Sequence, residues 1–486
     1  IQLVYGCREQ FADPDFMALD MGTFYQSRQS VEKALSEYLI FAQHNQHQNK
    51  IILDKILIIS DDKETIPIIE NYLLKNIDAS PNISYSFLSA LYFKIGRYDE
   101  SLKHQLAIAG DQQIRWKGLN TFAGNLRQEK QFKLAIQTYQ TLLQEIRSNK
   151  KEIEIKELGK VLLGLGQVYE DQILPHQISN SFILNEINNV FFSSGFYQPN
   201  NISTASLEQA IILYNTILNE LVSTSFSPKA HFRLGEIQFK VLQDLDGARL
   251  AYETALASSL DKKLAFKIHS SLIDLLMVEG KIADVQLYIS QLPRNVVAGN
   301  EGQLIIKSLK AMLINGDIDS SIVTLDNYLV HLSPIDKHFN DLMEMQTTLH
   351  THVTNGTGMD KEALLQYLKG EKLLIQNKLS EAITVFANMR LNQPTSNITA
   401  TAAVREIFSR LQLGQTAELK QPLQWLNESN DGDKGLVLSG EIAEFIDHDT
   451  QAALGLYEQL LQDYPKSLLV EPIRQHIREI RLNLES

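Results

Sequence analysis

Residues 85–102, YSFLSALYFKIGRYDESL, decide the fold of this chain. Apolar and aromatic side chains recur at helical spacing on both sides of Gly96, which predicts two helices joined by a tight turn. The inward positions of the two helices are Tyr85, Leu88, Tyr92, Tyr98, Ser101 and Leu102. One helix pair of this size cannot bury its own apolar face, so the pattern predicts further pairs stacked beside it.

The same pattern returns about 34 residues later, at Leu119, Phe122, Leu126, Lys130, Phe132, Ala135, Ile136 and Tyr139. Further units are centred on Leu165-Gly166, Leu234-Gly235, Gly370 and Leu438-Gly440. A helix-turn-helix period of this length, with a Leu-Gly-x-x-Tyr core, resembles the tetratricopeptide repeat (TPR) family over most of the chain. The resemblance implies an all-α fold, a right-handed TPR superhelix (α-solenoid) of about ten helix pairs.

The repeats divide the chain into three predicted segments. Residues 1–47 form an N-terminal segment, an irregular lead-in followed by a helix, because residues 1 to about 23 lack periodicity and contain Asp13-Pro14-Asp15. Residues 48–354 form a TPR array. Residues 355–486 hold the C-terminal TPR units and a capping helix, and the break before them is Asn355-Gly-Thr-Gly358.

One unit of the array is interrupted by an insertion at residues 175–206. Its first helix contains Leu165-Gly166, but the expected second helix returns only near Leu207, with Tyr214 in the late aromatic position. The insertion is rich in aromatic side chains, namely Phe182, Phe191, Phe192, Phe196 and Tyr197. Long insertions in repeat proteins are often functional. Two interpretations are open: the aromatics pack back onto the solenoid as an extra short helix, or they form a flap that docks a partner.

A TPR superhelix presents a long concave surface, which favours binding over catalysis. We therefore predict partner-binding residues in two places. The predicted groove residues of the central units are Asn120, Arg127, Gln167, Glu170, Glu236, Phe239 and Lys240. The predicted residues of the insertion are Phe191, Phe192, Phe196 and Tyr197. The alternative for each groove residue is ordinary solvated surface.

The sequence lacks the motifs of the common catalytic and cofactor sites. It contains no phosphate-binding loop, no dinucleotide fingerprint, no nucleophile elbow and no zinc pattern. Cys7 is the only cysteine, and His350 and His352 are two residues apart, which puts them on different faces of a helix. We expect no enzyme activity, no cofactor and no metal site.

Charge and hydropathy limit the partner class. The formal net charge is −13, which argues against nucleic acid, because phosphate binding needs clustered Lys and Arg. No stretch approaches 18 consecutive apolar residues, so no transmembrane segment is predicted. The chain begins at Ile1 and not at Met, so we expect that an N-terminal piece was removed, either as a signal peptide or by trimming.

The leading functional prediction is a non-enzymatic scaffold or adaptor for protein–protein interaction that binds a peptide or partner protein in its groove. The ending, from Tyr464-Pro465 to Arg474, Arg478 and Arg481, is similar to the last repeat of bacterial periplasmic TPR proteins of the Tol-Pal and outer-membrane assembly type. That resemblance implies a periplasmic location, with a cytoplasmic one as the alternative. It also supports a second function, a structural subunit of a bacterial cell-envelope complex at the membrane, joined edge to edge.

Overall fold

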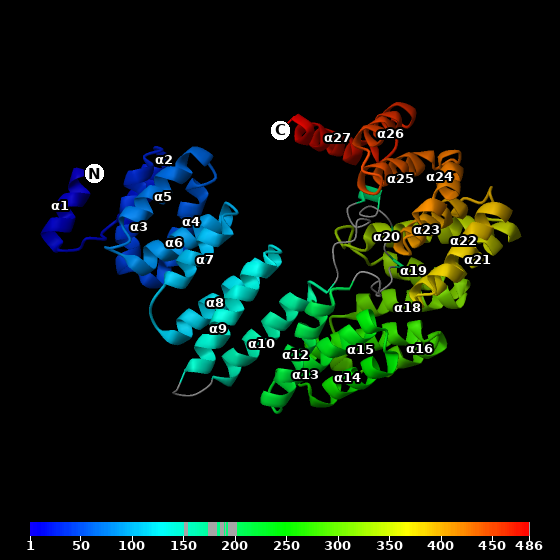
Figure 1. The fold of residues 1–486 in the computed structure, drawn as a ribbon, viewed down its shortest axis with the longest axis horizontal. Helices are drawn as coiled ribbons and strands as arrows, with labels where there is room; N and C mark the ends of the chain where they lie inside the picture. Colours follow the sequence, from blue (N-terminus) through cyan, green and yellow to red (C-terminus); the bar gives the residue numbers. More distant parts are fainter. Residues whose placement is uncertain (150–153, 174–181, 185–188, 190, 193–201, 486) are drawn as a thin grey trace. The chain divides into compact units, whose positions relative to one another are not determined.

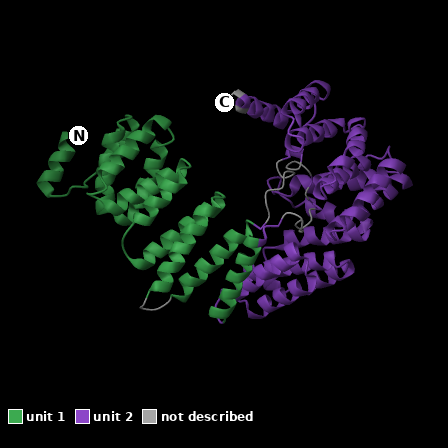
Figure 2. Ribbon diagram, in the orientation of Figure 1, with its two compact units in different colours: residues 1–172, 205–222 green, residues 173–204, 223–486 purple. Residues whose placement is uncertain are grey.

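The computed structural model describes residues 1–486 except 150–153, 174–181, 185–188, 190, 193–201 and 486 (Figure 1). The chain forms two compact units (Figure 2): unit 1 is Ile1–Gln172 with Ala205–Val222, and unit 2 is Ile173–Thr204 with Ser223–Ser486. The described part of the chain has helices and turns but no strand. In the same part, no helix is both long enough and apolar enough to cross a bilayer.

Unit 1 is a succession of α-helices with two short 3₁₀ turns at Gln46–Gln48 and Lys63–Thr65. Its helices are α1 (Gln2–Phe11), α2 (Ala18–Ser27), α3 (Val31–His44), α4 (Asn49–Ile59), α5 (Ile66–Lys75), α6 (Pro81–Lys94), α7 (Tyr98–Ala107), α8 (Gln112–Gln128), α9 (Phe132–Ser148), α10 (Ile155–Glu170) and α12 (Thr204–Glu220).

Unit 2 continues the succession. Its helices are α13 (Ser227–Ile237), α14 (Leu245–Ser258), α15 (Lys262–Val278), α16 (Ile282–Ser290), α17 (Arg294–Val297), α18 (Glu301–Asn315), α19 (Ile318–Leu329), α20 (Phe339–Leu349), α21 (Gly358–Ile375), α22 (Leu379–Asn392), α23 (Ile398–Gln412), α24 (Lys420–Asn427), α25 (Gly432–Phe445), α26 (Thr450–Asp463) and α27 (Val470–Glu485). Two π turns, η5 (Gln238–Leu242) and η6 (His350–Thr354), extend α13 and α20, and a 3₁₀ turn, η7 (Thr416–Glu418), precedes α24.

The predicted fold class, an all-α TPR-type array of helix pairs, is confirmed. Consecutive helices pack against each other as pairs: α2 with α3, α6 with α7, α8 with α9, α13 with α14, α15 with α16, α18 with α19, α21 with α22, α23 with α24, and α25 with α26. α27 packs on α26 and closes the array, as a capping helix does. α20 is an additional helix, which lies against α19.

Glycine allows the two helices of a pair to approach closely. A Cβ atom built on Gly235 of α13 would lie 2.7 Å from the ring of Tyr252 on α14. The same clash would occur between Gly22 and Tyr38, Gly370 and Phe386, and Gly440 and Tyr457. In each pair the aromatic ring therefore fills the space that a side chain on the first helix would occupy.

The interrupted unit keeps this contact despite the insertion. A Cβ atom on Gly166 of α10 would lie 2.6 Å from the ring of Tyr214 on α12. The Tyr214 hydroxyl donates a hydrogen bond of 2.7 Å to Glu170. α12 therefore packs on α10 through the same glycine and aromatic contact as the second helices of the other pairs.

The helix ends follow from local chemistry. Gly280 and Gly316 lie at turns between helices and have φ angles of 79° and 88°, a region that favours glycine. Asp111 caps α8 by accepting the backbone N–H groups of Gln113 and Ile114. Thr357 begins α21 with a capping box.

The predicted irregular lead-in is wrong in part, because residues 2–11 form helix α1. α1 buries none of its residues, although Leu3, Cys7 and Phe11 recur at helical spacing along it. The break before α2 does fall at Asp13-Pro14-Asp15, where Pro14 cannot continue a helix.

We predict that Gly440→Ala lowers the free energy of unfolding by about 1–3 kcal/mol, because the new methyl group collides with the Tyr457 ring. Gly455→Ala on the partner helix α26 is the matched control, because a Cβ atom there meets nothing within 4 Å. The control is expected to change stability little or to raise it by up to about 1 kcal/mol. Thermal and urea unfolding of the full chain measures both, and equal unfolding of the two variants would contradict the helix-pair contact.

Candidate functional site

The described part of the insertion lies against unit 2, to which it belongs. Phe182, Leu184, Phe191 and Phe192 are all buried. The Phe182 ring, which is 0% exposed, lies 6.3 Å from the ring of Phe408 on α23 and 5.7 Å from that of Phe445 on α25. For these residues the structure shows the first of the two interpretations: they pack back onto the helical repeats.

Glu441 of α25 binds the backbone of the insertion. Its carboxylate is fully buried and accepts hydrogen bonds from the N–H groups of Ile183 and Leu184, the latter at 3.3 Å. These two residues have helical backbone, and Phe182 directly precedes them. A carboxylate that receives N–H groups at the start of a helical turn is stabilised by charge and by geometry.

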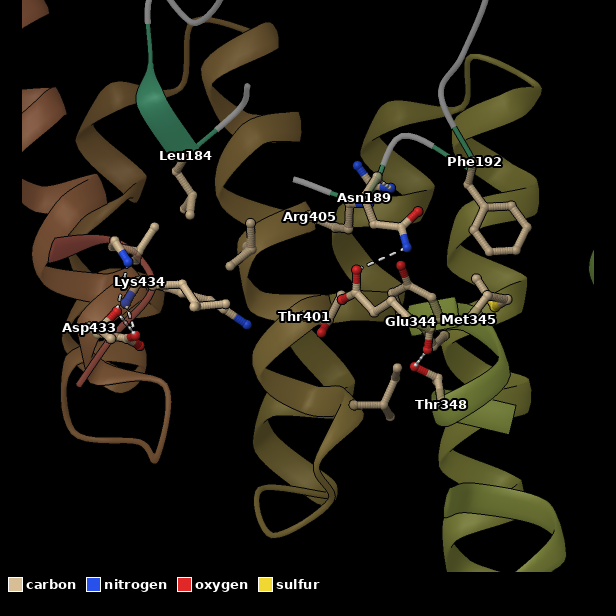
Figure 3. A pocket seen from close by; sticks show the side chains of 16 residues that line it. Leu184, Asn189, Phe192, Glu344, Met345, Thr348, Thr401, Arg405, Asp433 and Lys434 are labelled. Carbon is tan, nitrogen blue, oxygen red and sulfur yellow. Dashed lines mark hydrogen bonds between the residues drawn. The ribbon is translucent and has the colours of Figure 1, made fainter. Parts of the chain in front are cut away.

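Asn189 forms a second anchor, on α20 and α23 (Figure 3). Its side-chain amide donates to the carbonyl oxygen of Asp341 and to Glu344 Oε2, both at 3.0 Å. Its own backbone carbonyl accepts a hydrogen bond of 3.3 Å from the Arg405 guanidinium. Phe191 and Phe192 follow, with their rings edge to face at 4.9 Å in the core of unit 2.

Arg405 is held in place by a buried acid. The Nε atom of Arg405 lies 2.7 Å from Oε1 of Glu371 on α21. Glu371 is fully buried, and the same oxygen accepts a hydrogen bond of 2.5 Å from the Tyr367 hydroxyl. Burial and the Glu371 charge raise the pKa of Tyr367, so its hydroxyl remains a donor. This network fixes the guanidinium that contacts the insertion.

We use the name inner groove for the surface that these contacts define: Asp341 and Glu344 of α20, Glu371 of α21, Arg405 and Phe408 of α23, and Glu441 and Phe445 of α25. Beside the insertion the inner groove encloses a cavity of about 470 Å³ (Figure 3). Its lining is Leu184, Asn189, Phe192, Glu344, Met345, Thr348, Tyr367, Ile398, Thr401, Val404, Arg405, Asp433, Lys434, Ser467, Leu468 and Leu469. A cavity of this size and mainly apolar lining is typical of binding sites.

A repeated Gly-Glu pair on the first helices supplies the buried acids. Glu236, Glu371 and Glu441 each follow the glycine that contacts the aromatic ring, at Gly235, Gly370 and Gly440. Glu236 accepts a hydrogen bond of 2.7 Å from Ser271 on the next first helix, α15, and Glu371 pairs with Arg405 on α23. Glu441 instead holds the insertion. The repetition of Gly-Glu was the sequence signal that could have identified Glu371 and Glu441 as groove residues.

Of the predicted groove residues in unit 1, three are engaged in contacts within that unit. The Arg127 guanidinium pairs with Asp171 at 2.5 Å and donates to Gln167 at 2.8 Å. Glu170 accepts the Tyr214 hydroxyl. Asn120, also on α8, is half-buried. Arg127 and Gln167 therefore join neighbouring first helices, as Glu371 and Arg405 do in unit 2.

The predicted groove residues of unit 2 lie together on α13 and η5. Glu236 pairs with Lys240 at 2.7 Å and accepts the Tyr252 hydroxyl at 2.7 Å, while Phe239 is only 1% exposed. None of the three lines the cavity. Phe196 and Tyr197, predicted in the insertion, lie outside the described residues.

Comparison with known proteins adds little. No family model matches the chain, and no curated protein matches it. Solved structures that it is similar to include the human IFIT1 dimer with m7Gppp-AAAA (14% identity, 87% of each chain, TM-score 0.27) and yeast Tom70 (12% identity, 97% of this chain and 100% of that chain, TM-score 0.26). A third similar structure is the P58(IPK) TPR domain (13% identity, 90% of this chain and 98% of that chain, TM-score 0.21). These TM-scores are too low for the likenesses to bear on function.

We predict that unit 2 loses stability in acid because Glu236 becomes protonated. Burial alone raises the pKa of its carboxyl, but Lys240, Tyr252 and Ser271 outweigh burial and hold that pKa below its ordinary value. A carboxyl with a lowered pKa in the folded state contributes stability above its unfolded pKa, and this stability is lost as the pH falls through the folded pKa.

Glu236→Gln should therefore unfold more easily than the wild type at neutral pH and lose less stability between about pH 7 and pH 3.5. Urea unfolding at both pH values measures this difference. Glu458→Gln is the control, because Glu458 is in an exposed ion pair with Arg481 that contributes little. An unchanged pH dependence in Glu236→Gln would show that the buried pair does not stabilise the fold.

Proposed function

We propose that this chain is a non-enzymatic scaffold for protein–protein interaction, built from TPR-type repeats, and that its inner groove binds a polypeptide segment of a partner protein. One observation carries the proposal: the groove already holds the described residues of the insertion, Phe182 to Leu184, Asn189, Phe191 and Phe192, in part by backbone contacts that any polypeptide could make. Backbone N–H groups reach Glu441, and a backbone carbonyl reaches Arg405.

The chemistry of the groove supports a polypeptide ligand over other ligand classes. Its buried acids Glu371 and Glu441 are acceptors for N–H and guanidinium donors, which suits a peptide backbone. The same acids, and the formal net charge of −13, disfavour the phosphates of a nucleic acid. A protein partner is therefore the class that we propose.

A second candidate is a structural subunit of a bacterial cell-envelope complex, joined edge to edge, with a periplasmic location. It is supported by the resemblance of the ending from Tyr464-Pro465 to Arg481, and by the surface of the last helix. Leu482 and Leu484 of α27 are 66% and 65% exposed, and such apolar side chains suit an interface at the end of the array.

Site-specific photocrosslinking in cells that make the protein separates the two candidates. We predict that a photoreactive phenylalanine analogue at Thr401, in the cavity of the groove, crosslinks a discrete partner. The same residue at Val323 of α19, which is 61% exposed, is the control and should give no such product. Crosslinking from Leu482 with none from Thr401 would overturn the inner groove as the binding site and favour the structural subunit joined edge to edge.

A further inference from the structure

A row of exposed aliphatic side chains lies on the second helices of three consecutive helix pairs in unit 2. Each of these helices packs through a residue that is completely buried, namely Ala248 of α14, Val285 of α16 and Ser321 of α19. The residue two positions later lies about 200° further around the helix and therefore faces solvent. That residue is Leu250, Leu287 and Val323 in turn, and it is 68%, 57% and 61% exposed.

The repeat itself does not require an aliphatic side chain at this place. Four other second helices carry a different residue two positions after a fully buried small one: Lys103 of α7, Gln137 of α9, Thr384 of α22 and Gly455 of α26. Apolar surface left in water costs free energy, and exposed apolar patches that are rimmed by polar residues mark interaction sites. The row is therefore a property of these three pairs and not of the fold.

Carboxylates flank the row at helical spacing. Asp246 precedes Leu250 by four residues, and Glu253 follows it by three. Asp284 precedes Leu287 by three residues. At these spacings each acid lies on the same helix face as the aliphatic residue. All three acids are exposed, and in the part of the chain that the structure describes none of them is in an ion pair.

The cations that border these acids are already neutralised. Arg249 is the only lysine or arginine in the sequences of α14 and α16, and its guanidinium lies 2.6 Å from Glu279, directly after α15. Lys281, at the start of α16, lies 3.1 Å from the same carboxylate. α14 and α16 both pack on α15 (Figure 1), and Glu279 joins them at the surface. We use the name α14–α16 surface for Asp246, Leu250, Glu253, Asp284 and Leu287.

The α14–α16 surface does not continue onto α19, because the acids beside Val323 have partners. Asp319 stands four residues before Val323 and Asp326 three residues after it, which is the spacing found in α14. Lys361 lies 3.8 Å from Asp319, and Gln346 donates a hydrogen bond of 2.7 Å to Asp326. Val323 is therefore an exposed aliphatic residue without free acids beside it.

We propose that the α14–α16 surface docks an amphipathic helix of a partner protein, whose apolar stripe is flanked by Lys or Arg. The apolar stripe covers Leu250 and Leu287, and the cations face Asp246, Glu253 and Asp284. Charge complementarity selects this class of partner, because like charges at an interface are costly and opposite charges steer association. None of the five residues lines the cavity of the inner groove, so one chain can hold two different polypeptides.

Fluorescence anisotropy of the full chain with a synthetic helical peptide tests the proposal. The Lys peptide contains only Leu and Lys, with Leu in a single stripe, and the Glu peptide has Glu in place of every Lys. We expect the full chain to bind the Lys peptide and not the Glu peptide. Leu287→Gln should weaken binding of the Lys peptide about fivefold or more, because an apolar contact is lost. Val323→Gln is the matched control and should leave binding unchanged.

A second set of variants tests the charges. The double variant Glu253→Gln and Asp284→Asn should weaken binding of the Lys peptide and reduce its dependence on salt between about 50 mM and 500 mM. Asp319→Asn is the control, because Asp319 and Asp284 both lie in the first turn of a second helix and Asp319 already pairs with Lys361. The substituted side chains are all exposed, so thermal melts of these variants should match that of the intact chain.

Equal binding of the two peptides would overturn the partner chemistry, and equal loss in Leu287→Gln and Val323→Gln would overturn the assigned site. Self-association in sedimentation velocity that Leu287→Gln abolishes, with no binding of the Lys peptide, would show that a second copy is the occupant and that the proposal is wrong. Binding to phosphatidylcholine vesicles with the same dependence would likewise assign a membrane surface instead. Crosslinking from Thr401 is measured separately, so the function proposed for the inner groove stands or falls independently.

Discussion

The close approach of two helices at a glycine is the contact on which the rest of this structure depends. Where Gly235 or Gly440 lacks a side chain, the ring of Tyr252 or Tyr457 from the second helix fills the space. A fixed aromatic at this depth sets the distance between the helices of a pair. It thereby sets which residues of the first helix remain free to face the next pair.

The residue directly after that glycine shows the consequence. Glu236, Glu371 and Glu441 occupy this position, and all three are buried. Acids in such a place are costly unless they are paired, so each must find donors on a neighbouring element. Besides donors within their own helix pairs, Glu236 and Glu371 each accept one from the next first helix, Ser271 and Arg405, which ties successive pairs together. The donors of Glu441 lie on the insertion. The buried acid after the glycine thus joins successive repeats at two positions and holds the insertion at the third.

The sequence was sufficient for the repeats because their contacts are local and periodic. Gly166 and Tyr214 could be matched across the insertion, since each keeps its place in the repeat pattern. Helix α1 was missed because it is short and buries none of its residues, although Leu3, Cys7 and Phe11 recur along it at helical spacing. The groove was missed for another reason. Phe182 packs against Phe445, and the N–H group of Ile183 donates to Glu441, and in both contacts more than half of the chain length separates the two residues in sequence. Such pairings follow from how unit 2 folds, and no local spacing encodes them.

In the polypeptide binding proposed for the inner groove, affinity and selectivity would have separate sources. The contacts of Glu441 and Arg405 go to backbone atoms, so they hold any polypeptide with the right backbone geometry and do not read its sequence. Selectivity must come from the side-chain sites: the Phe408 and Phe445 surface that takes Phe182, and the core that takes Phe191 and Phe192. Because aromatic side chains bury large areas at low entropic cost, two such sites are enough to distinguish one segment from many. In this structure the insertion supplies both aromatic elements, through Phe182 at the Phe408 and Phe445 surface and through Phe191 and Phe192 in the core of unit 2.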